Sequence, residues 1–257
     1  MLATSVAATA AGDWRTSLQQ AVTLHQAGDL NSASVHHREA LNGHEPLRSN
    51  WAVLTNAALA MQPESAEEAV HTFQRVIEIQ PDNADSYFNL GTALCDCKER
   101  EADAVDAFKV AIQLNPSDGG AHYNLGTTQL QLGGEQNTAD ALSSLTTATQ
   151  IEPDEGKNWH SLGDARAASS MWPESVEAYR RATALRPGHS PSWASLGNAL
   201  EEISDGDAAI AAWQRALKLH PQARHDACPV ADPFPCPCPR SSLHPRQCRH
   251  RSILVCF

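Results

Sequence analysis

The chain has 257 residues, of which 42% are hydrophobic, so it can bury a substantial core in one or two domains. Its formal net charge of -11 is uneven, because residues 222–257 carry five Arg and two Asp, which leaves -14 for residues 1–221. A body this acidic excludes nucleic acid as a partner and favours neutral or basic polypeptide segments.

No stretch approaches the eighteen or so apolar residues that a bilayer-spanning helix needs, so no membrane association is expected. The first eight residues lack the basic start of a secretory signal. We therefore expect a cytoplasmic protein, with a nuclear location as the alternative, and a disordered N-terminus over residues 1–13.

From residue 81 onward the sequence repeats with a visible period. The pair Leu-Gly recurs four times, each time with its Leu nine residues after a proline, and an alanine precedes the next proline by five residues. The Leu-Gly pairs begin at Leu90, Leu125, Leu162 and Leu196. Only the spacing from Gly to the late alanine varies, between 19 and 22 residues, so insertions are expected in one loop of each repeat, near Lys98–Arg100 and Gly133–Asn137.

Each repeat is predicted to be a pair of helices. Tyr87, Leu90, Gly91 and Leu94 form an apolar stripe at helical spacing over residues 84–97, and such a stripe needs a neighbouring helix. Gly and Ala are expected where the paired helices cross closely, and large apolar residues fill the space between crossings. The residues directly after the prolines (Asp82, Ser117 and Asp154) are predicted to cap the next helix.

The pattern resembles the tetratricopeptide repeat, in which W-x2-L-G-x2-Y is followed by A-x3-F and then P. Residues 193–221 show it as Trp193-x2-Leu196-Gly197, Ala209-x3-Trp213 and Pro221; residues 159–187, 87–116 and 122–153 match it in turn, and residues 14–81 hold two weaker units. The resemblance implies an all-α, right-handed superhelical solenoid of about six helix-turn-helix repeats. The expected repeats are 14–47, 48–81, 82–116, 117–153, 154–187 and 188–221, followed by a disordered tail over 222–257.

In this family, the first helices of successive repeats line a concave groove, and the groove binds a partner. The side chains expected there are mostly neutral and rich in amides, which suit the backbone of an extended peptide. They are Asn56, Phe88, Asn89, Thr92, Tyr123, Asn124, Thr127, His160, Asp164, Asn198 and Glu201. The alternative is that each is simply a solvated side chain of a helix.

Two known versions of this groove carry characteristic residues at these positions. The carboxylate clamp of tetratricopeptide co-chaperones needs cations where this chain has Ala52, Gly120 and Asn124, so the clamp is excluded. The array also resembles that of O-linked N-acetylglucosamine transferases, whose groove carries an asparagine ladder. Asn89 and Asn124 match two rungs, whereas Ser161 and Ser195 occupy the next two.

The leading functional hypothesis is therefore a scaffold or adaptor that binds a peptide segment, and the alternative is the substrate-recruiting part of a larger glycosyltransferase. Motifs of phosphate loops, zinc proteases and serine hydrolases are absent from the sequence, so no enzymatic activity, cofactor or metal is expected. His36-His37 is predicted to be a surface pair, and Cys95 and Cys97 to be buried or half-buried free thiols.

Periodicity stops after Pro221. Five of the seven cysteines lie in residues 222–257, where Cys236, Cys238, Cys248 and His250 do not match a familiar zinc spacing and disorder is expected. Since a solenoid normally ends in a polar capping helix, two further expectations follow. The last repeat would self-associate through its uncovered face, and the tail would be an unrelated extension of the gene model that replaces further repeats or a catalytic domain.

Overall fold

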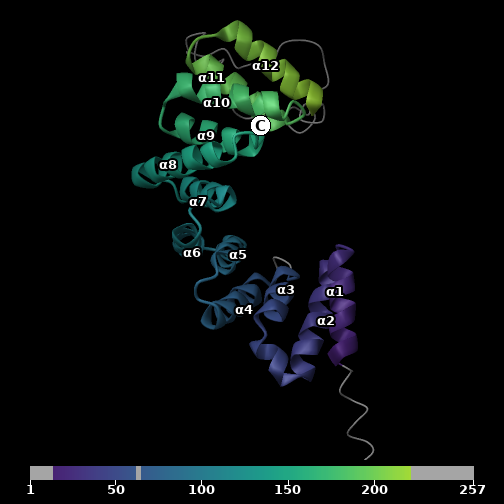
Figure 1. The fold of residues 1–257 in the computed structure, drawn as a ribbon. Coiled ribbons are helices and arrows are strands. Elements are labelled where there is room, and N and C mark those ends of the chain that lie inside the picture. Colours follow the sequence, from purple (N-terminus) through teal and green to yellow (C-terminus); the bar gives the residue numbers. More distant parts are fainter. Residues whose placement is uncertain (1–13, 62–64, 221–257) are drawn as a thin grey trace, which may run out of the picture. The chain divides into compact units, whose positions relative to one another are not determined.

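The computed structural model describes residues 14–61 and 65–220, and every regular element in these ranges is a helix (Figure 1). The chain divides into two compact units at residues 151 and 152. The helices of unit one are α1 (Trp14–Gln26), α2 (Leu30–Gly43), the 3-10 helix η1 (Glu45–Ser49), α3 (Trp51–Leu59), α4 (Ala66–Ile79), α5 (Ala84–Cys95), α6 (Glu101–Leu114), α7 (Gly119–Leu132) and α8 (Glu135–Ile151). Those of unit two are α9 (Gly156–Ala168), α10 (Trp172–Leu185), α11 (Ser190–Glu202) and α12 (Gly206–Leu219). The predicted all-α helical-repeat fold is confirmed.

Within each repeat the two helices interlock at the glycine of the Leu-Gly pair. A Cβ atom on Gly91 would lie 2.6 Å from the Phe108 ring, and one on Gly163 would lie 2.5 Å from the Tyr179 ring. The other two glycines, Gly126 and Gly197, face Leu145 and Trp213 in the same way. The absence of a side chain on the first helix therefore makes room for the large residue of the second.

Successive repeats pack through a shared apolar core in each unit. In unit one, Phe73 of α4 and Phe108 of α6 belong to a buried cluster that also takes in Leu94 of α5 and Leu125 of α7. In unit two, α10, α11 and α12 form a second cluster around Tyr179 and Leu196. The first helices of neighbouring repeats also touch directly, α5 with α7 and α9 with α11.

The loop that joins one repeat to the next is fixed by the residue at the tryptophan position of the motif. The indole Nε1 of Trp159 donates to the Pro153 carbonyl at 2.7 Å, and that of Trp193 to the Pro187 carbonyl at 3.0 Å. In α7 the Nε2 of His122 lies 3.1 Å from the carbonyl oxygen of Pro116. Each proline is thus tied to the ring six residues later.

Two of the three predicted caps are displaced by one residue, and at α9 the cap position is held not by Asp154 but by Glu155, whose side chain makes no capping hydrogen bond. The side chain of Asn83, not Asp82, accepts from the backbone N–H of Ser86 at the start of α5. Asp118, not Ser117, accepts from the Ala121 N–H at the start of α7. The residue after the proline still belongs to the turn, and the extended backbone that a cap requires is reached only one position later.

The insertion in the fourth repeat lies partly inside a helix, which corrects the prediction of a longer loop. Gly133 and Gly134 form the turn with positive φ angles of 67° and 86°, and α8 begins at Glu135. α8 has 17 residues, against 14 in α6, so the extra residues add nearly one helical turn.

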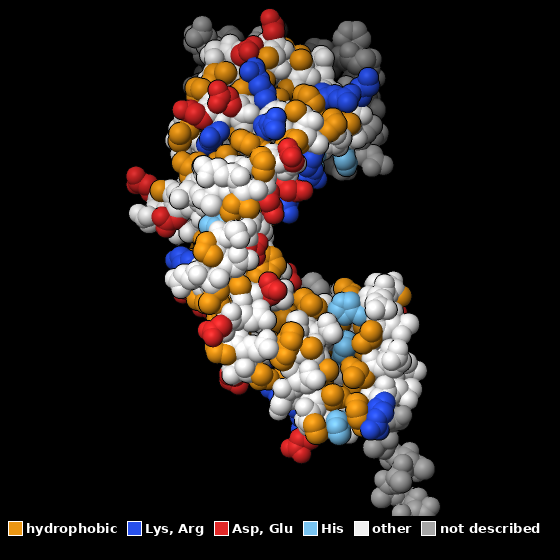
Figure 2. Space-filling model, in the orientation of Figure 1, with side chains coloured by type: hydrophobic (Ala, Val, Ile, Leu, Met, Phe, Trp, Pro, Cys, Tyr) orange, Lys and Arg blue, Asp and Glu red, His pale blue; other side chains and the backbone are white. Residues whose placement is uncertain are grey.

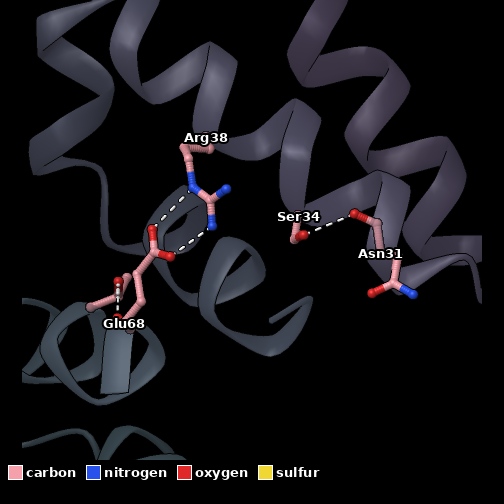
Figure 3. Close-up of polar contacts among 5 residues, drawn as sticks. Asn31, Ser34, Arg38 and Glu68 are labelled. Atoms are coloured by element: carbon pink, nitrogen blue, oxygen red, sulfur yellow. Dashed lines mark hydrogen bonds and ion pairs between the residues drawn. The ribbon is translucent and has the colours of Figure 1, made fainter. Parts of the chain in front are cut away.

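Polar contacts connect the first repeat to the second (Figure 3). Arg38 of α2 makes a two-pronged ion pair with Glu68 of α4, with Nε to Oε1 at 3.1 Å and Nη2 to Oε2 at 2.6 Å. Within the second repeat, Arg75 of α4 donates to the Arg48 carbonyl of η1. Both members of the ion pair are about half exposed, so this connection is expected to contribute modestly to stability.

Two sequence predictions about single residues need correction, those for His37 and Cys95. His37 is buried rather than at the surface, since it is 1% exposed and neither ring nitrogen has a hydrogen-bond partner in the part of the chain that the structure describes. Cys95 is exposed, whereas Cys97 is buried as expected. The N-terminal segment, the tail and its cysteines lie outside the described residues.

Candidate functional site

Each unit has its own candidate site on the face of its first helices: the first-helix face of unit one consists of the exposed and half-buried side chains of α3, α5 and α7, and the first-helix face of unit two consists of those of α9 and α11. Of the predicted residues, Asn56, Thr92 and Asn198 are exposed and the others are half-buried. Every one therefore has some access to solvent.

The residue that follows each Leu-Gly pair forms different hydrogen bonds in the two units. In unit two this residue accepts a hydrogen bond from the aromatic side chain of the second helix: the Tyr179 hydroxyl donates to Asp164 Oδ1 at 2.6 Å, and Trp213 Nε1 donates to Asn198 Oδ1 at 3.0 Å. In unit one the second helix offers Phe108 or Leu145, which have no donor. The equivalent residues there are threonines.

Those threonines bond to their own helices. The Thr92 hydroxyl donates to the Phe88 carbonyl at 3.0 Å, and the Thr127 hydroxyl lies 3.1 Å from the carbonyl oxygens of Tyr123 and Asn124. Their only proton is therefore used inside α5 or α7, so they can only accept from a ligand.

The amides of unit one are arranged differently. Asn89 on α5 and Asn124 on α7 stand at equivalent positions, one residue before each Leu-Gly pair, and both are half-buried. Within the described residues, neither side-chain amide forms a hydrogen bond, and the same holds for the exposed Asn56 on α3. These three amides keep their donors and acceptors for solvent or a ligand.

Phe88 contributes to packing as well as to the face. Its ring lies 6.0 Å from the Phe108 ring, centroid to centroid, and it packs against the apolar cluster of unit one. A Cβ on Gly120, at the start of α7, would lie 3.7 Å from it. Phe88 thus joins α5, α6 and α7, and its partly exposed surface is an apolar platform beside the amides.

A polar network in unit two contains residues that the sequence did not lead us to expect at the site. His160 Nε2 lies 3.6 Å from Asp164 Oδ2, and His160 Nδ1 lies 3.2 Å from Ser192 Oγ. Ser192 Oγ in turn lies 2.7 Å from His189 Nδ1. The missed members are Tyr179, His189 and Ser192. Tyr179 could have been found, because it follows Gly163 by the same 16 residues that separate Gly197 from Trp213.

Burial sets the electrostatics of this network. Burial, followed by the negative charge of Asp164, raises the pKa of Tyr179, which stays a neutral donor. Burial, followed by the positive charge of Arg186, lowers the pKa of His189. The order Ser192–His160–Asp164 resembles a hydrolytic triad, but Ser192 is completely buried, so no substrate can reach its hydroxyl.

The charges at the surface differ between the two units. Over α1 and α2, the view in Figure 2 shows mostly hydrophobic, histidine and uncharged side chains. Over α9 to α12, basic and acidic side chains are interspersed.

In residues 14–61 and 65–220, His, Cys, Asp and Glu form no group of three or more that could hold a metal ion. No helix among the described residues has both the length and the apolar character needed to cross a bilayer.

Comparison with known families decides the repeat type. Residues 72–105 and 160–224 each match a tetratricopeptide repeat model. The chain contains tetratricopeptide repeats. No sequence of a curated protein matches the chain.

Several solved structures share the helical-repeat fold. PilF of Pseudomonas aeruginosa is 18% identical with a TM-score of 0.65, and the alignment covers 81% of this chain and 92% of that one. YrrB, described as a tetratricopeptide protein with an unusual peptide-binding site, is 20% identical with a TM-score of 0.59, covering 72% and 92%. MamA of Desulfovibrio magneticus RS-1 is 19% identical with a TM-score of 0.61, covering 68% and 96%. At these identities the likeness concerns the fold alone.

Proposed function

We propose that this protein is an interaction scaffold that binds an extended polypeptide segment along the first-helix face of unit one. The observation that carries the proposal is the pair Asn89 and Asn124. Their amides have no partner among the described residues, although the neighbouring polar groups Thr92 and Thr127 bond within their own helices. A peptide-binding site in YrrB, which has the same fold, supports the proposal.

The chemistry of an amide suits a peptide backbone. Each Asn side chain offers a carbonyl acceptor and two N–H donors, which match the N–H and C=O groups that an extended peptide leaves unpaired. Because α5 contacts α7, Asn89 and Asn124 lie on adjacent helices of one unit. The partly exposed ring of Phe88 adds an apolar contact next to them.

The acidity of residues 1–221 leads us to propose a neutral or basic segment as the ligand. Their formal charge of -14 repels acidic chains at long range. Association is therefore expected to slow as salt concentration rises, because screening weakens the attraction.

The test uses the full chain and an array of immobilised, blocked nonapeptides of random composition. The double variant Asn89→Ala, Asn124→Ala should lose most of the peptides that the wild type retains. The matched control is Asn31→Ala, which changes an exposed asparagine on the second helix α2. Unchanged retention by the double variant, with unchanged helical circular dichroism, would refute the assignment of the face.

Substrate recruitment for a larger glycosyltransferase is the alternative. It is favoured by the same pair of asparagines, which resembles two rungs of a ladder. Ser161, at the next rung, is only 7% exposed, so it offers little to a ligand. A nucleotide-sugar domain encoded downstream in the same gene would favour this alternative, and its absence would favour the adaptor.

Self-association through α12 is a separate proposal with its own observation. Val70 of α4, Val105 of α6 and Val176 of α10 occupy the same position of their helices and are at most 7% exposed, while Leu142 of α8 is half-buried there. The equivalent residue of α12, Ile210, is 52% exposed. Sedimentation velocity should show a size that rises with concentration for the wild type and stays constant for Ile210→Glu. A constant size for both would end this proposal.

A further inference from the structure

Asp164 directly follows the Leu-Gly pair of its repeat, and it is the only acidic residue at this position in the four Leu-Gly repeats. The equivalent residues are Thr92, Thr127 and Asn198, all neutral. The Asp164 side chain is 43% exposed, so its charge is presented at the first-helix face of unit two and not confined to the core.

The two oxygens of this carboxylate are in different situations. Oδ1 accepts from the Tyr179 hydroxyl at 2.6 Å, and Tyr179 is 3% exposed. Oδ2 lies 3.6 Å from His160 Nε2, which is longer than a hydrogen bond. The tyrosine therefore fixes the orientation of the carboxylate and leaves Oδ2 with most of its capacity to accept.

No lysine or arginine in the described part of the chain forms an ion pair with Asp164. Arg166, two residues further on, donates instead to the Glu174 carbonyl at 2.9 Å. The basic side chain within 4 Å of Asp164 is His160, whose other nitrogen is engaged with Ser192. The His160 ring also packs between two other rings, with centroids 5.7 Å from Tyr179 and 5.3 Å from His189. It forms a fixed, flat surface beside the carboxylate.

We propose that Asp164, beside the ring of His160, binds a lysine or arginine side chain of a peptide segment at the first-helix face of unit two. This inference rests on the proposed function and extends it to unit two. An oriented carboxylate forms a charge-assisted hydrogen bond without first losing the freedom of a mobile side chain.

The neighbouring repeat shows that a neutral variant can fold. Asn198 occupies the equivalent position and accepts from Trp213 through its Oδ1, as Asp164 does from Tyr179. Asp164→Asn keeps such an acceptor for the tyrosine hydroxyl and removes only the charge. It is therefore the informative variant.

The experiment uses the full chain and a positional-scanning library of blocked nonapeptides, in which each pool fixes one residue at one position. The wild type should retain pools that fix Lys or Arg at one position about tenfold better than pools that fix Gln there, and Asp164→Asn should lose most of that preference. The control is Asp154→Asn, which removes the same charge from an aspartate whose side chain is 89% exposed, in the loop before α9.

Each outcome is decisive. Retention of no pool by the wild type would refute the proposed function. Retention without a Lys or Arg preference, or with a preference that persists in Asp164→Asn, would refute this inference while leaving the proposed function in place. Equal loss in Asp154→Asn would show that net charge, not this site, sets the preference.

Discussion

The ring of Tyr179 lies against the backbone of Gly163, where a Cβ atom would approach it to 2.5 Å. The same tyrosine donates its hydroxyl proton to Asp164, the residue after that glycine. One contact between two helices therefore sets both the packing of the fifth repeat and the orientation of a candidate binding residue.

Gly163→Ala is expected to destabilise the protein by about 1–3 kcal/mol, because the added methyl group forces a buried ring to move. Urea unfolding followed by circular dichroism measures the change. The matched control is Gly206→Ala at the start of α12, where a Cβ would meet nothing within 4 Å. Alanine there should be neutral or slightly stabilising. Equal stability of the two variants would contradict the interlock of glycine and ring.

Trp193→Phe should cost about 1 kcal/mol, since it removes the N–H that donates to the Pro187 carbonyl at 3.0 Å. The ring and its apolar contacts are largely kept. Trp51→Phe serves as the control, because Trp51 is 42% exposed and its indole has no hydrogen bond among the residues described. A loss of the same size in both variants would mean that the bond to the proline does not fix the loop.

Asp118→Ala should destabilise the chain by about 1 kcal/mol, because the carboxylate accepts from the Ala121 N–H and caps α7. Ser117→Ala should change the free energy of unfolding by less than about 0.5 kcal/mol. Thermal unfolding of both variants at the same pH distinguishes the two positions. A larger loss of stability in Ser117→Ala than in Asp118→Ala would show that Ser117, the residue next to the proline, is the cap.

His37 predicts a dependence of stability on pH. Burial, followed by the nearby charge of His25, lowers its pKa from the ordinary 6.5 to about 4 in the folded protein. As the pH falls, the unfolded chain takes up the proton before the folded protein does. The free energy of unfolding therefore decreases by up to about 3 kcal/mol between pH 6.5 and pH 4.

His37→Leu removes that titration and the unpaired ring nitrogens together. The variant should be more stable than the wild type at pH 7, and its advantage should grow toward pH 4.5. Free energies of unfolding in urea at several pH values give the comparison, with the exposed His71→Gln as control. An advantage that stays constant over this range would show that His37 is not buried as a neutral base.

Much of the fold followed from local sequence. The repeated spacing of proline, Leu-Gly and alanine was sufficient to predict paired helices, and the four glycines meet the large residues of the second helices as expected. Helix boundaries were less certain. The cap moved from Ser117 to Asp118 because the turn geometry, and not the type of residue, decides where the extended backbone occurs.

The candidate site was predictable only as a set of positions. That Asn89 and Asn124 belong to one face follows from their register in the repeat, which the sequence displays directly. Whether a polar side chain on that face is available depends on bonds within its own helix and on contacts with the second helix of the pair. Thr127 bonds to its own helix, whereas Asp164 receives the proton of Tyr179.

The sequence by itself determined the module, because its period records the short-range spacing at which helices can pair. Only the tertiary structure decided the state of individual groups: the burial of His37, the exposure of Ile210 and the orientation of Asp164. These states depend on which side chains meet across a helix pair or between repeats. Such contacts are set by packing in three dimensions, and the periodic pattern alone does not specify them.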